Sequence, residues 1–257
     1  MSKVNRRSVL GWLVASAICP AIARSDPAAE TFEVASYEGP VVLARYAANR
    51  IGRRPSVVLL HGMRGFELRL RAYERYATAL TAKGIDAYFL HFYSAADSQR
   101  LKELKASESR VAYEMERYPA WAGRVSSTIT AILARGDSSD RLGLLGFSLG
   151  GFVAAATAAR DSRISALAVL YGEMPGNIAS QVKHMPAVIE LHGDADRNVS
   201  LASGEALIAL AKSVGAPAEL IKYPGKGHGF DFADNDPATV DAVERISRFF
   251  ELRLGSA

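Results

Sequence analysis

Cysteine is almost absent from this sequence. Cys19 is the single cysteine among 257 residues, which excludes a disulfide framework and any zinc site that needs two cysteines. A large excess of charge is missing too. The chain has 31 lysines and arginines against 27 aspartates and glutamates, and residues 1–23 hold three of the cations and no acid. The rest of the chain is nearly neutral and lacks the basic face that nucleic acid requires, so nucleic-acid binding is excluded.

Motifs for metal and nucleotide chemistry are missing as well. No HExxH pair, P-loop or strand-associated GxGxxG occurs in the chain, so we expect neither a metal ion nor a cofactor. The composition is 49% hydrophobic and 23% charged, which is typical of a globular domain with a full core. A chain of this length buries enough apolar surface to fold without a disulfide or a structural metal.

The first 23 residues resemble an export signal. A charged start with Arg6 and Arg7 precedes an apolar run from Val9 to Ile22, and alanines at 21 and 23 suit signal peptidase. The arginine pair resembles a twin-arginine signal. The alternatives are an ordinary secretory signal and a retained membrane anchor, and the run is short for a span of about 20 residues, which disfavours the anchor.

We therefore expect residues 1–23 to be removed together with Cys19, and residues 24–257 to form one domain. The twin-arginine export machinery would be the partner that carries it across the membrane. The mature chain would be periplasmic or secreted, with no membrane attachment. A chain without any thiol suits an oxidising compartment.

Strands and helices alternate along the mature chain. Two runs, 31–35 and 41–47, flank a turn at 38–40 and predict an antiparallel pair. Later runs are mostly apolar at every position, as in strands buried on both faces; they are 57–60, 87–90, 142–145, 166–170, 188–191 and 218–223. Helical spacing of apolar residues follows most of them, over 68–80, 121–133, 152–159, 201–214 and 240–250. The pattern predicts an α/β fold, a mostly parallel sheet with helices on both faces and a ligand site beyond the carboxyl ends of its strands.

Residues 94–119 fit this alternation least. They are polar, of mixed charge and poor in large apolar side chains. We interpret them as a solvated excursion that holds a helix. A lid over the site is the alternative.

A serine follows one of the predicted strands in a glycine-rich turn. The segment Gly146-Phe147-Ser148-Leu149-Gly150-Gly151 comes directly after the run 142–145 and opens an alanine-rich helix, which matches the nucleophile elbow G-x-S-x-G. A tight turn projects the hydroxyl away from the backbone, and only glycine lets the neighbouring chain pass so closely. We predict Ser148 as a nucleophile; the alternative is a serine that caps the helix.

A serine nucleophile needs a base, and the base needs an acid that sets its tautomer. His228 lies between glycines in the loop after the run 218–223, while Asp194 and Asp196 both lie in the loop after 188–191. The chain order serine, aspartate, histidine is the one that elbow hydrolases use. We predict His228 as the base and Asp196 as the acid, because Asp196 reaches farther past its strand. Asp194 is the alternative acid and otherwise a turn former.

Two backbone amides are candidates for holding an oxyanion. The loop 61–65 follows the run 57–60, and its Met63 N–H would act together with the N–H of Leu149 at the start of the helix. Other side chains near these loops are candidates for a pocket wall or for core packing; they are Phe66, Phe147, Tyr171, Met174 and Phe230. We interpret the remaining histidines, His61, His91, His184 and His192, as structural or surface residues.

With these motifs the mature chain resembles the dienelactone hydrolase family of the α/β-hydrolases over most of its length. The resemblance rests on five segments: His61-Gly62, the doubled glycine at 150–151, Tyr171-Gly172, Gly193-Asp194-Ala195-Asp196 and Gly227-His228-Gly229-Phe230. It implies an α/β-hydrolase fold, with the family's acid at Asp196 and its base at His228. The founding enzymes use cysteine where this chain has Ser148, and the 61–65 loop has no acid at its head to match the glutamate that holds their thiol.

The combined pattern predicts a serine hydrolase that cleaves small-molecule carboxylic esters through an acyl-enzyme. A serine peptidase and an acyltransferase use the same triad. A binding protein that has lost the chemistry is the alternative from another functional class. Fold alone selects neither the ester nor the oligomeric state.

Overall fold

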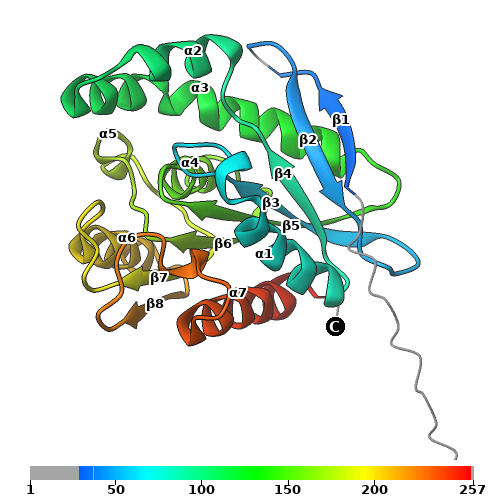
Figure 1. The fold of residues 1–257 in the computed structure, drawn as a ribbon. Coiled ribbons are helices and arrows are strands. Elements are labelled where there is room, and N and C mark those ends of the chain that lie inside the picture. The colour runs from blue at the N-terminus through cyan, green and yellow to red at the C-terminus, as the bar shows by residue number, and fades with distance from the viewer. Residues whose placement is uncertain (1–28, 37, 256–257) are drawn as a thin grey trace, which may run out of the picture.

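Eight strands form one sheet through the centre of the structure (Figure 1). The computed structural model describes residues 29–36 and 38–255, so the predicted export signal, Cys19 included, lies outside the described residues. The strands are β1 (Glu30–Val34), β2 (Val41–Tyr46), β3 (Arg54–Leu60), β4 (Asp86–Leu90), β5 (Ser138–Phe147), β6 (Ile164–Leu170), β7 (Ala187–Gly193) and β8 (Ala218–Tyr223).

The strand order is β1-β2-β4-β3-β5-β6-β7-β8. Strand β2 pairs antiparallel with both β1 and β4, and every other neighbouring pair is parallel. The prediction of a mostly parallel sheet is confirmed, and each predicted strand is present. Because parallel strands point the same way, the loops after β3, β5, β6, β7 and β8 gather along one edge of the sheet.

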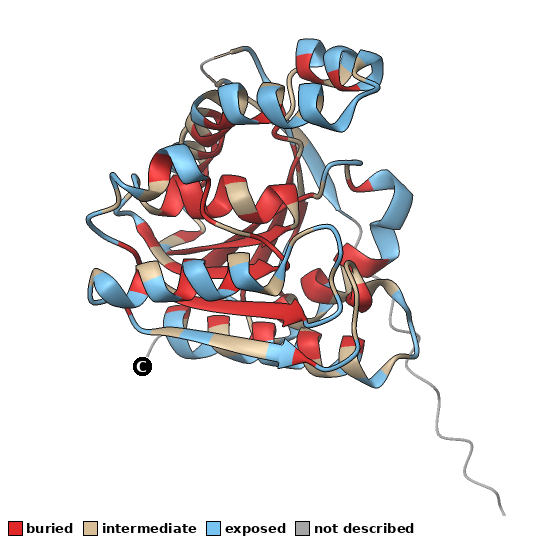
Figure 2. Cartoon of the chain, turned by 90° about the vertical axis from the view of Figure 1, so that its left-hand side faces the viewer, coloured by how far each residue is buried: buried red, intermediate tan, exposed pale blue. Residues whose placement is uncertain are grey.

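Helices cover both faces of the sheet (Figure 1). Helices α1 and α7 pack together on one face, and α3, α4 and α6 cover the other. Helices α1, α3, α6 and α7 have exposed outer sides and buried inner sides, whereas α4 is buried almost throughout (Figure 2). The helical elements are η1 (Glu67–Arg69), α1 (Leu70–Ala82), α2 (Ala95–Glu103), α3 (Ser107–Leu133), α4 (Leu149–Ala158), α5 (Gly176–Ala179), α6 (Leu201–Ser213), η2 (Phe230–Phe232) and α7 (Pro237–Leu254).

Two hydrophobic cores result, because successive side chains of a strand point to opposite faces of a sheet. In β3, Val57 and Leu59 pack into the core under α1 and α7, while Val58 and Leu60 pack into the core under α3, α4 and α6. All four side chains are fully buried. This explains why the strand is apolar at consecutive positions instead of alternating.

The polar segment that fits the pattern least forms α2 and the first turns of α3. Its centre is Asp97, which is fully buried and accepts hydrogen bonds from Arg117 Nε and the Tyr113 hydroxyl, both at 2.7 Å, and from Trp121 Nε1 at 3.0 Å. Burial alone would raise the pKa of Asp97, but hydrogen bonds from Arg117, Tyr113 and Ser94 hold that pKa well below its usual value. The segment is therefore ordered by a buried anion, and it contains more helix than expected.

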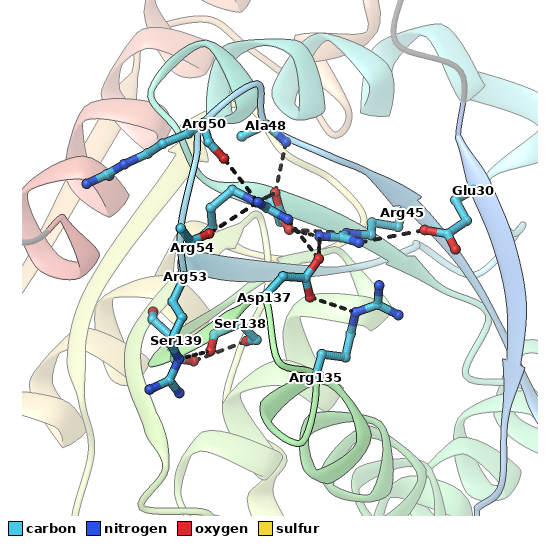
Figure 3. A network of polar contacts seen from close by, with 12 residues as sticks. Glu30, Arg45, Ala48, Arg50, Arg53, Arg54, Arg135, Asp137, Ser138 and Ser139 are labelled. Carbon is cyan, nitrogen blue, oxygen red and sulfur yellow. Dashed lines mark hydrogen bonds and ion pairs between the residues drawn. The ribbon is translucent and has the colours of Figure 1, made fainter.

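A buried ion network joins the sheet at the edge opposite the site loops. Asp86, at the start of β4, accepts hydrogen bonds from Arg45 Nη2 at 2.5 Å, Arg54 Nε at 2.9 Å and the Ala48 N–H at 2.8 Å. Figure 3 shows both arginines also reaching Asp137, at 2.6 and 2.8 Å. Their side chains are only 6% and 12% exposed, so the two carboxylates neutralise cations that water reaches poorly.

Replacing Asp86 by alanine removes the more deeply buried of the two carboxylates that Arg45 and Arg54 share, and leaves only Asp137 in common. Removing one partner of a buried ion pair typically costs about 3–5 kcal/mol, and we expect Asp86→Ala to lower the free energy of unfolding by that amount in a urea titration. Asp140→Ala is the matched control, because Asp140 is an exposed aspartate of β5, which pairs with the strand of Arg54; its effect should stay below about 0.5 kcal/mol. Equal stability of the two variants would contradict this account of the network.

Candidate active site

Ser148 lies between β5 and α4 in a conformation that side chains rarely adopt. Its φ is +52° and its ψ is −122°, which costs about 1–3 kcal/mol. The turn leaves no room for side chains at the flanking glycines. A Cβ on Gly146 would lie 2.3 Å from the carbonyl oxygen of Gly150, and a Cβ on Gly150 would lie 2.2 Å from the carbonyl oxygen of Leu60. The strand, turn and helix predicted around Ser148 are all present.

Loops after β7 and β8 bring Asp196 and His228 to Ser148. The His228 Nε2 lies 2.9 Å from Ser148 Oγ, and its Nδ1 lies 2.7 Å from Asp196 Oδ2. The other carboxylate oxygen of Asp196 accepts the N–H groups of Asn198 and Val199, at 2.8 and 3.0 Å. The Asp196 side chain is fully buried, whereas that of His228 is 20% exposed. The three predicted side chains thus form one hydrogen-bonded set.

Asp194 occupies a different position in the same loop. Its Oδ1 accepts the N–H of Gly225 at 2.6 Å, and its own N–H donates to the carbonyl of Tyr223 at 3.2 Å. Both partners belong to β8 or the loop after it. Asp194 therefore ties the loop of Asp196 to the loop of His228, instead of bonding only within its own turn.

The two predicted oxyanion amides belong to segments that flank Ser148. Leu149 is the first residue of α4, where N–H groups have no acceptor inside the helix and the helix dipole is positive. The loop that carries Met63 passes close to Ser148, since a Cβ on Gly62 would lie 3.7 Å from the Ser148 Cβ. The Tyr73 hydroxyl holds this loop by accepting the Gly62 N–H at 3.2 Å.

Sequence patterns did not reveal a buried support formed by Asp231 and two tyrosines. Tyr171, directly after β6, has a φ of +43°, and its ring centroid lies 4.6 Å from that of His228. Its hydroxyl and that of Tyr76 both donate to Asp231, each at 2.8 Å. Burial raises the pKa of Asp231, and the tyrosine donors offset part of this rise. The arrangement holds Tyr171 against His228 although its backbone is strained.

Comparison with known proteins establishes the family. The model of the Dienelactone hydrolase family matches residues 41–253. The chain belongs to the dienelactone hydrolase family. It is 27% identical over 161 residues to a protein of Escherichia coli O157:H7 named "Putative carboxymethylenebutenolidase", with 57% of this chain and 55% of that protein covered. A Salmonella typhimurium protein of the same name is 26% identical over 147 residues, with 54% and 50% covered. The chain thus spans about half the length of the curated relatives it matches.

Solved structures are similar over nearly the whole described chain. A dienelactone hydrolase from Anabaena variabilis superposes with a TM-score of 0.69 at 18% identity, covering 89% of this chain and 99% of the other. The thermostable carboxylesterase EstE1, cloned from a metagenomic library, gives 0.70 at 14% identity, covering 89% and 90%. This member of the dienelactone hydrolase family therefore has the predicted α/β-hydrolase fold.

In this family member, Ser148 and His228 face a cleft of about 1030 Å³. Phe147 and Tyr171, two of the five predicted pocket residues, line it. The other three do not line it and are buried in the hydrophobic cores; they are Phe66, Met174 and Phe230. Two of them pack against other core rings: Phe66 stacks on Phe89, and Phe230 contacts Tyr223 with the rings tilted. Aromatic packing inside the cores therefore accounts for residues that sequence position alone assigned to the pocket.

The first turns of α3 supply a cleft wall that the sequence interpretation missed. Val111, Met115 and Tyr118 line the cleft, and the first two are exposed apolar side chains. Pro119 lies inside the helix and has no N–H for the carbonyl of Met115 four residues earlier. That carbonyl instead accepts Asn177 Nδ2 of α5 at 3.5 Å. The helical spacing of 111, 115 and 118 was the signal that could have revealed this wall.

The histidines outside the hydrogen-bonded set have other surroundings. His61 stacks on Phe92 with ring centroids 4.3 Å apart, and its Nδ1 lies 2.8 Å from the Gly62 carbonyl oxygen. Burial lowers the pKa of His61 to about 3, so the ring is neutral and orders the loop that carries Met63. His91 lies 3.6 Å from a carboxylate oxygen of Glu67. His184 is exposed.

Two further observations concern residues 29–36 and 38–255. In these ranges no three or more histidine, cysteine, aspartate or glutamate side chains are arranged to hold a metal ion. None of the helices described there combines the length and the apolar character needed to cross a membrane.

Glu114 gives the cleft wall a charge that depends on pH. Burial raises the pKa of Glu114 to about 6, and Arg110 offsets part of the rise. The folded-state pKa thus lies above the ordinary value of 4.5. The stability that protonated Glu114 contributes is therefore complete at low pH and is lost as the pH rises through about 6.

We expect Glu114→Gln, which stays neutral, to have a higher Tm than the wild type at about pH 8 and the same Tm at about pH 4. Differential scanning calorimetry at the two pH values measures this. Glu116→Gln is the control because Glu116 is exposed on the same helix. A gain in Tm that is the same for both variants, or independent of pH, would refute the assignment.

Proposed function

We propose that this member of the dienelactone hydrolase family is a serine hydrolase that cleaves carboxylic esters through an acyl-enzyme. One observation carries the proposal: the unbroken hydrogen-bond path from Ser148 Oγ through His228 to Asp196, at 2.9 and 2.7 Å. The path ends at the floor of an open cleft. Such a path is the requirement for making a serine hydroxyl reactive at neutral pH.

In the first half-reaction, Ser148 Oγ bonds to the ester carbonyl carbon while its proton moves to His228 Nε2. The carbonyl π electrons move to the oxygen, which becomes an oxyanion facing the N–H groups of Met63 and Leu149. When the oxyanion collapses, the bond between the carbonyl carbon and the alcohol oxygen breaks. His228 returns the proton to that oxygen, so the alcohol leaves neutral and the acyl group stays on Ser148.

In the second half-reaction, water takes the place of the alcohol. His228 Nε2 removes a proton from the water as its oxygen bonds to the acyl carbon, and the oxyanion forms again at the same two amides. Collapse then breaks the bond to Ser148 Oγ, and His228 delivers the proton to that oxygen. The products are a carboxylic acid and the free serine, so no cofactor is needed.

Asp196 sets the state of the base throughout. Its Oδ2 accepts the Nδ1–H of His228, which leaves Nε2 free to take the proton of Ser148. The Asn198 and Val199 N–H groups stabilise its negative charge without neutralising it. The buried carboxylate is therefore available to stabilise the imidazolium that forms in each half-reaction.

The lining of the cleft supports an ester with an apolar part. Four exposed apolar side chains lie around Ser148, which are Met63, Leu68, Val111 and Met115. Exposed apolar side chains gathered in a cleft are typical of a ligand surface. The curated relatives carry a name that refers to a butenolide, a cyclic ester, and the serine of this chain favours a broader range of carboxylic esters.

Ser148→Ala removes the nucleophile and leaves the fold intact. We expect kcat/KM for p-nitrophenyl butyrate to fall by several orders of magnitude, because the acyl-enzyme no longer forms. The circular dichroism spectrum and Tm should stay close to those of the wild type. Labelling of the wild-type chain by a fluorophosphonate probe, followed by mass spectrometry, should locate the probe on Ser148. A folded wild-type chain that neither reacts with the probe nor cleaves an ester would point to a binding protein instead.

Asparagine at the two neighbouring acids separates their roles. Asp196→Asn should lower kcat by about 10⁴-fold, because an amide stabilises the wrong tautomer of His228. Asp194→Asn keeps an oxygen for the Gly225 N–H and does not contact His228, so its kcat should fall far less. Steady-state kinetics on one ester compares the two, and equal losses would contradict the assignment of Asp196 as the acid.

A further inference from the structure

Behind Asp196 lies a buried pair of titratable groups that the reaction does not use. Glu190 and His192 stand two residues apart on β7, and both side chains are fully buried. The His192 Nδ1 lies 2.9 Å from Glu190 Oε1, and its Nε2 lies 3.0 Å from the carbonyl oxygen of Val199. Each nitrogen of the imidazole therefore has one fixed partner.

These partners determine where one proton must lie. A carbonyl oxygen only accepts hydrogen bonds, so His192 Nε2 carries a proton and donates it to Val199. A second proton lies between Nδ1 and Glu190 Oε1, whichever of the two atoms holds it. Glu190 therefore determines the tautomer of His192 in the same way that Asp196 determines that of His228.

The Nε2–H of His192 connects this pair to the loop of the acid. The carbonyl oxygen of Val199 accepts a hydrogen bond from His192 Nε2 at 3.0 Å, and the N–H of Val199 donates one to Asp196 Oδ1, also at 3.0 Å. His192 Nε2 itself lies 3.6 Å from Asp196 Oδ2, the oxygen that contacts His228. The position of Asp196 therefore depends on His192 through one intervening residue.

Stability of the fold does not explain why this polar pair is buried here. Glu190 Oε1 also accepts the Gly172 N–H at 3.3 Å, while Oε2 is buried with no hydrogen-bond partner among the described residues. A Cβ on Gly204 of α6 would lie 2.6 Å from Glu190 Oε1 and 2.8 Å from His192 Nδ1. The glycine of α6 thus leaves room for two buried polar groups. Replacing such a pair by apolar side chains is often neutral or stabilising.

The proton affinities of the pair agree with this geometry. Burial raises the pKa of Glu190, and the hydrogen bond from His192 offsets part of the rise. Burial lowers the pKa of His192, but its hydrogen bonds to Glu190 and Val199, together with the negative charges of Glu190 and Asp196, raise it above its ordinary value. Both groups therefore bind protons more strongly than they would in water.

We propose that Glu190 and His192 are positioning residues of the hydrolase: Glu190 orients His192, and the Nε2–H of His192 holds Val199 so that Asp196 stays in line with His228. The proposal rests on the proposed function for its effect on turnover. It predicts that loss of the pair lowers kcat more than it changes KM, because substrate contacts are untouched and only the base is misaligned.

The test replaces both groups by apolar side chains of similar size, in the double variant Glu190→Leu/His192→Phe. Replacing both partners leaves no buried charge unpaired, so Tm should be equal to or above that of the wild type. We expect kcat for p-nitrophenyl acetate to fall about tenfold to 100-fold, the loss that a small misplacement of a catalytic group produces, with KM nearly unchanged. A folded double variant with wild-type kcat would overturn the proposal.

Two single variants sharpen the result. Glu190→Gln lets the side-chain amide donate to His192 Nδ1 and so keeps the proton on Nε2; it should retain most of the wild-type kcat. Asp86→Ala is the stability control, because it weakens the fold at the opposite edge of the sheet without contacting the loop of Asp196. Loss of kcat in this control equal to that of the double variant would show a general effect of stability and overturn the proposal.

A second measurement uses the wild-type chain and does not depend on any variant folding. With ¹⁵N-labelled histidine, His192 Nε2 should remain protonated from about pH 5 to pH 9, and the Nδ1–H of His228 should give a low-field proton resonance. In the double variant that resonance should broaden or disappear. Deprotonated Nε2 in His192 would refute the geometry. Failure of the wild type to turn over any ester would remove the proposed function, while these resonances would still decide whether the pair positions Asp196.

Discussion

The site depends on a turn into which no side chain fits. Where the chain passes from β5 to α4, Gly146 lies against the backbone of Gly150 and Gly151, and Gly150 lies against the backbone that ends β3. This crowding leaves Ser148 no ordinary conformation. A hydrogen bond to the sheet stabilises this strained conformation. The Ser148 N–H donates to the Leu170 carbonyl at 3.0 Å, so the β-ladder continues through the strained residue. The hydroxyl then projects at the sheet edge where the loop of His228 arrives, because both strands end there.

Four buried carboxylates differ in the kind of partner that stabilises their charge. At the opposite edge Asp86 is neutralised by two arginines, and Asp97 in the first turn of α2 is neutralised by one. Near the site, Asp196 receives two backbone N–H groups and Asp231 two tyrosine hydroxyls. Neutral donors stabilise an anion without cancelling its field. The neutralised charges of Asp86 and Asp97 order the surrounding elements, whereas the charge of Asp196 remains available to the imidazole of His228.

The parts that local sequence determines were predictable. Apolar runs and helical periodicity located every strand of the sheet, because burial on one or both faces imposes a spacing of two or near 3.6 residues. The elbow around Ser148 was also predictable, because its glycines are required by backbone contacts close to the turn itself. Asp231 was not, because its tyrosine partners Tyr76 and Tyr171 lie 155 and 60 residues away in sequence. The three core residues assigned to the pocket show the same limit: a side chain after a strand end faces either the cleft or the core, and only packing decides which.

The wall formed by α3 shows why a polar segment can still carry part of a site. Residues 94–119 were interpreted as a solvated excursion because they are polar and of mixed charge, yet Val111, Met115 and Tyr118 of α3 line the cleft beside the buried Glu114. The place of α3 is set by Asp97, whose donors lie up to 24 residues further along the chain, and by the free carbonyl that Pro119 leaves for Asn177. Polar contacts therefore position this part of α3. Val111 and Met115 are not needed to anchor the helix in a hydrophobic core, and they stay exposed in the cleft. An apolar surface kept open in this way is available to a substrate, which is the condition that a hydrolase of this family has to meet.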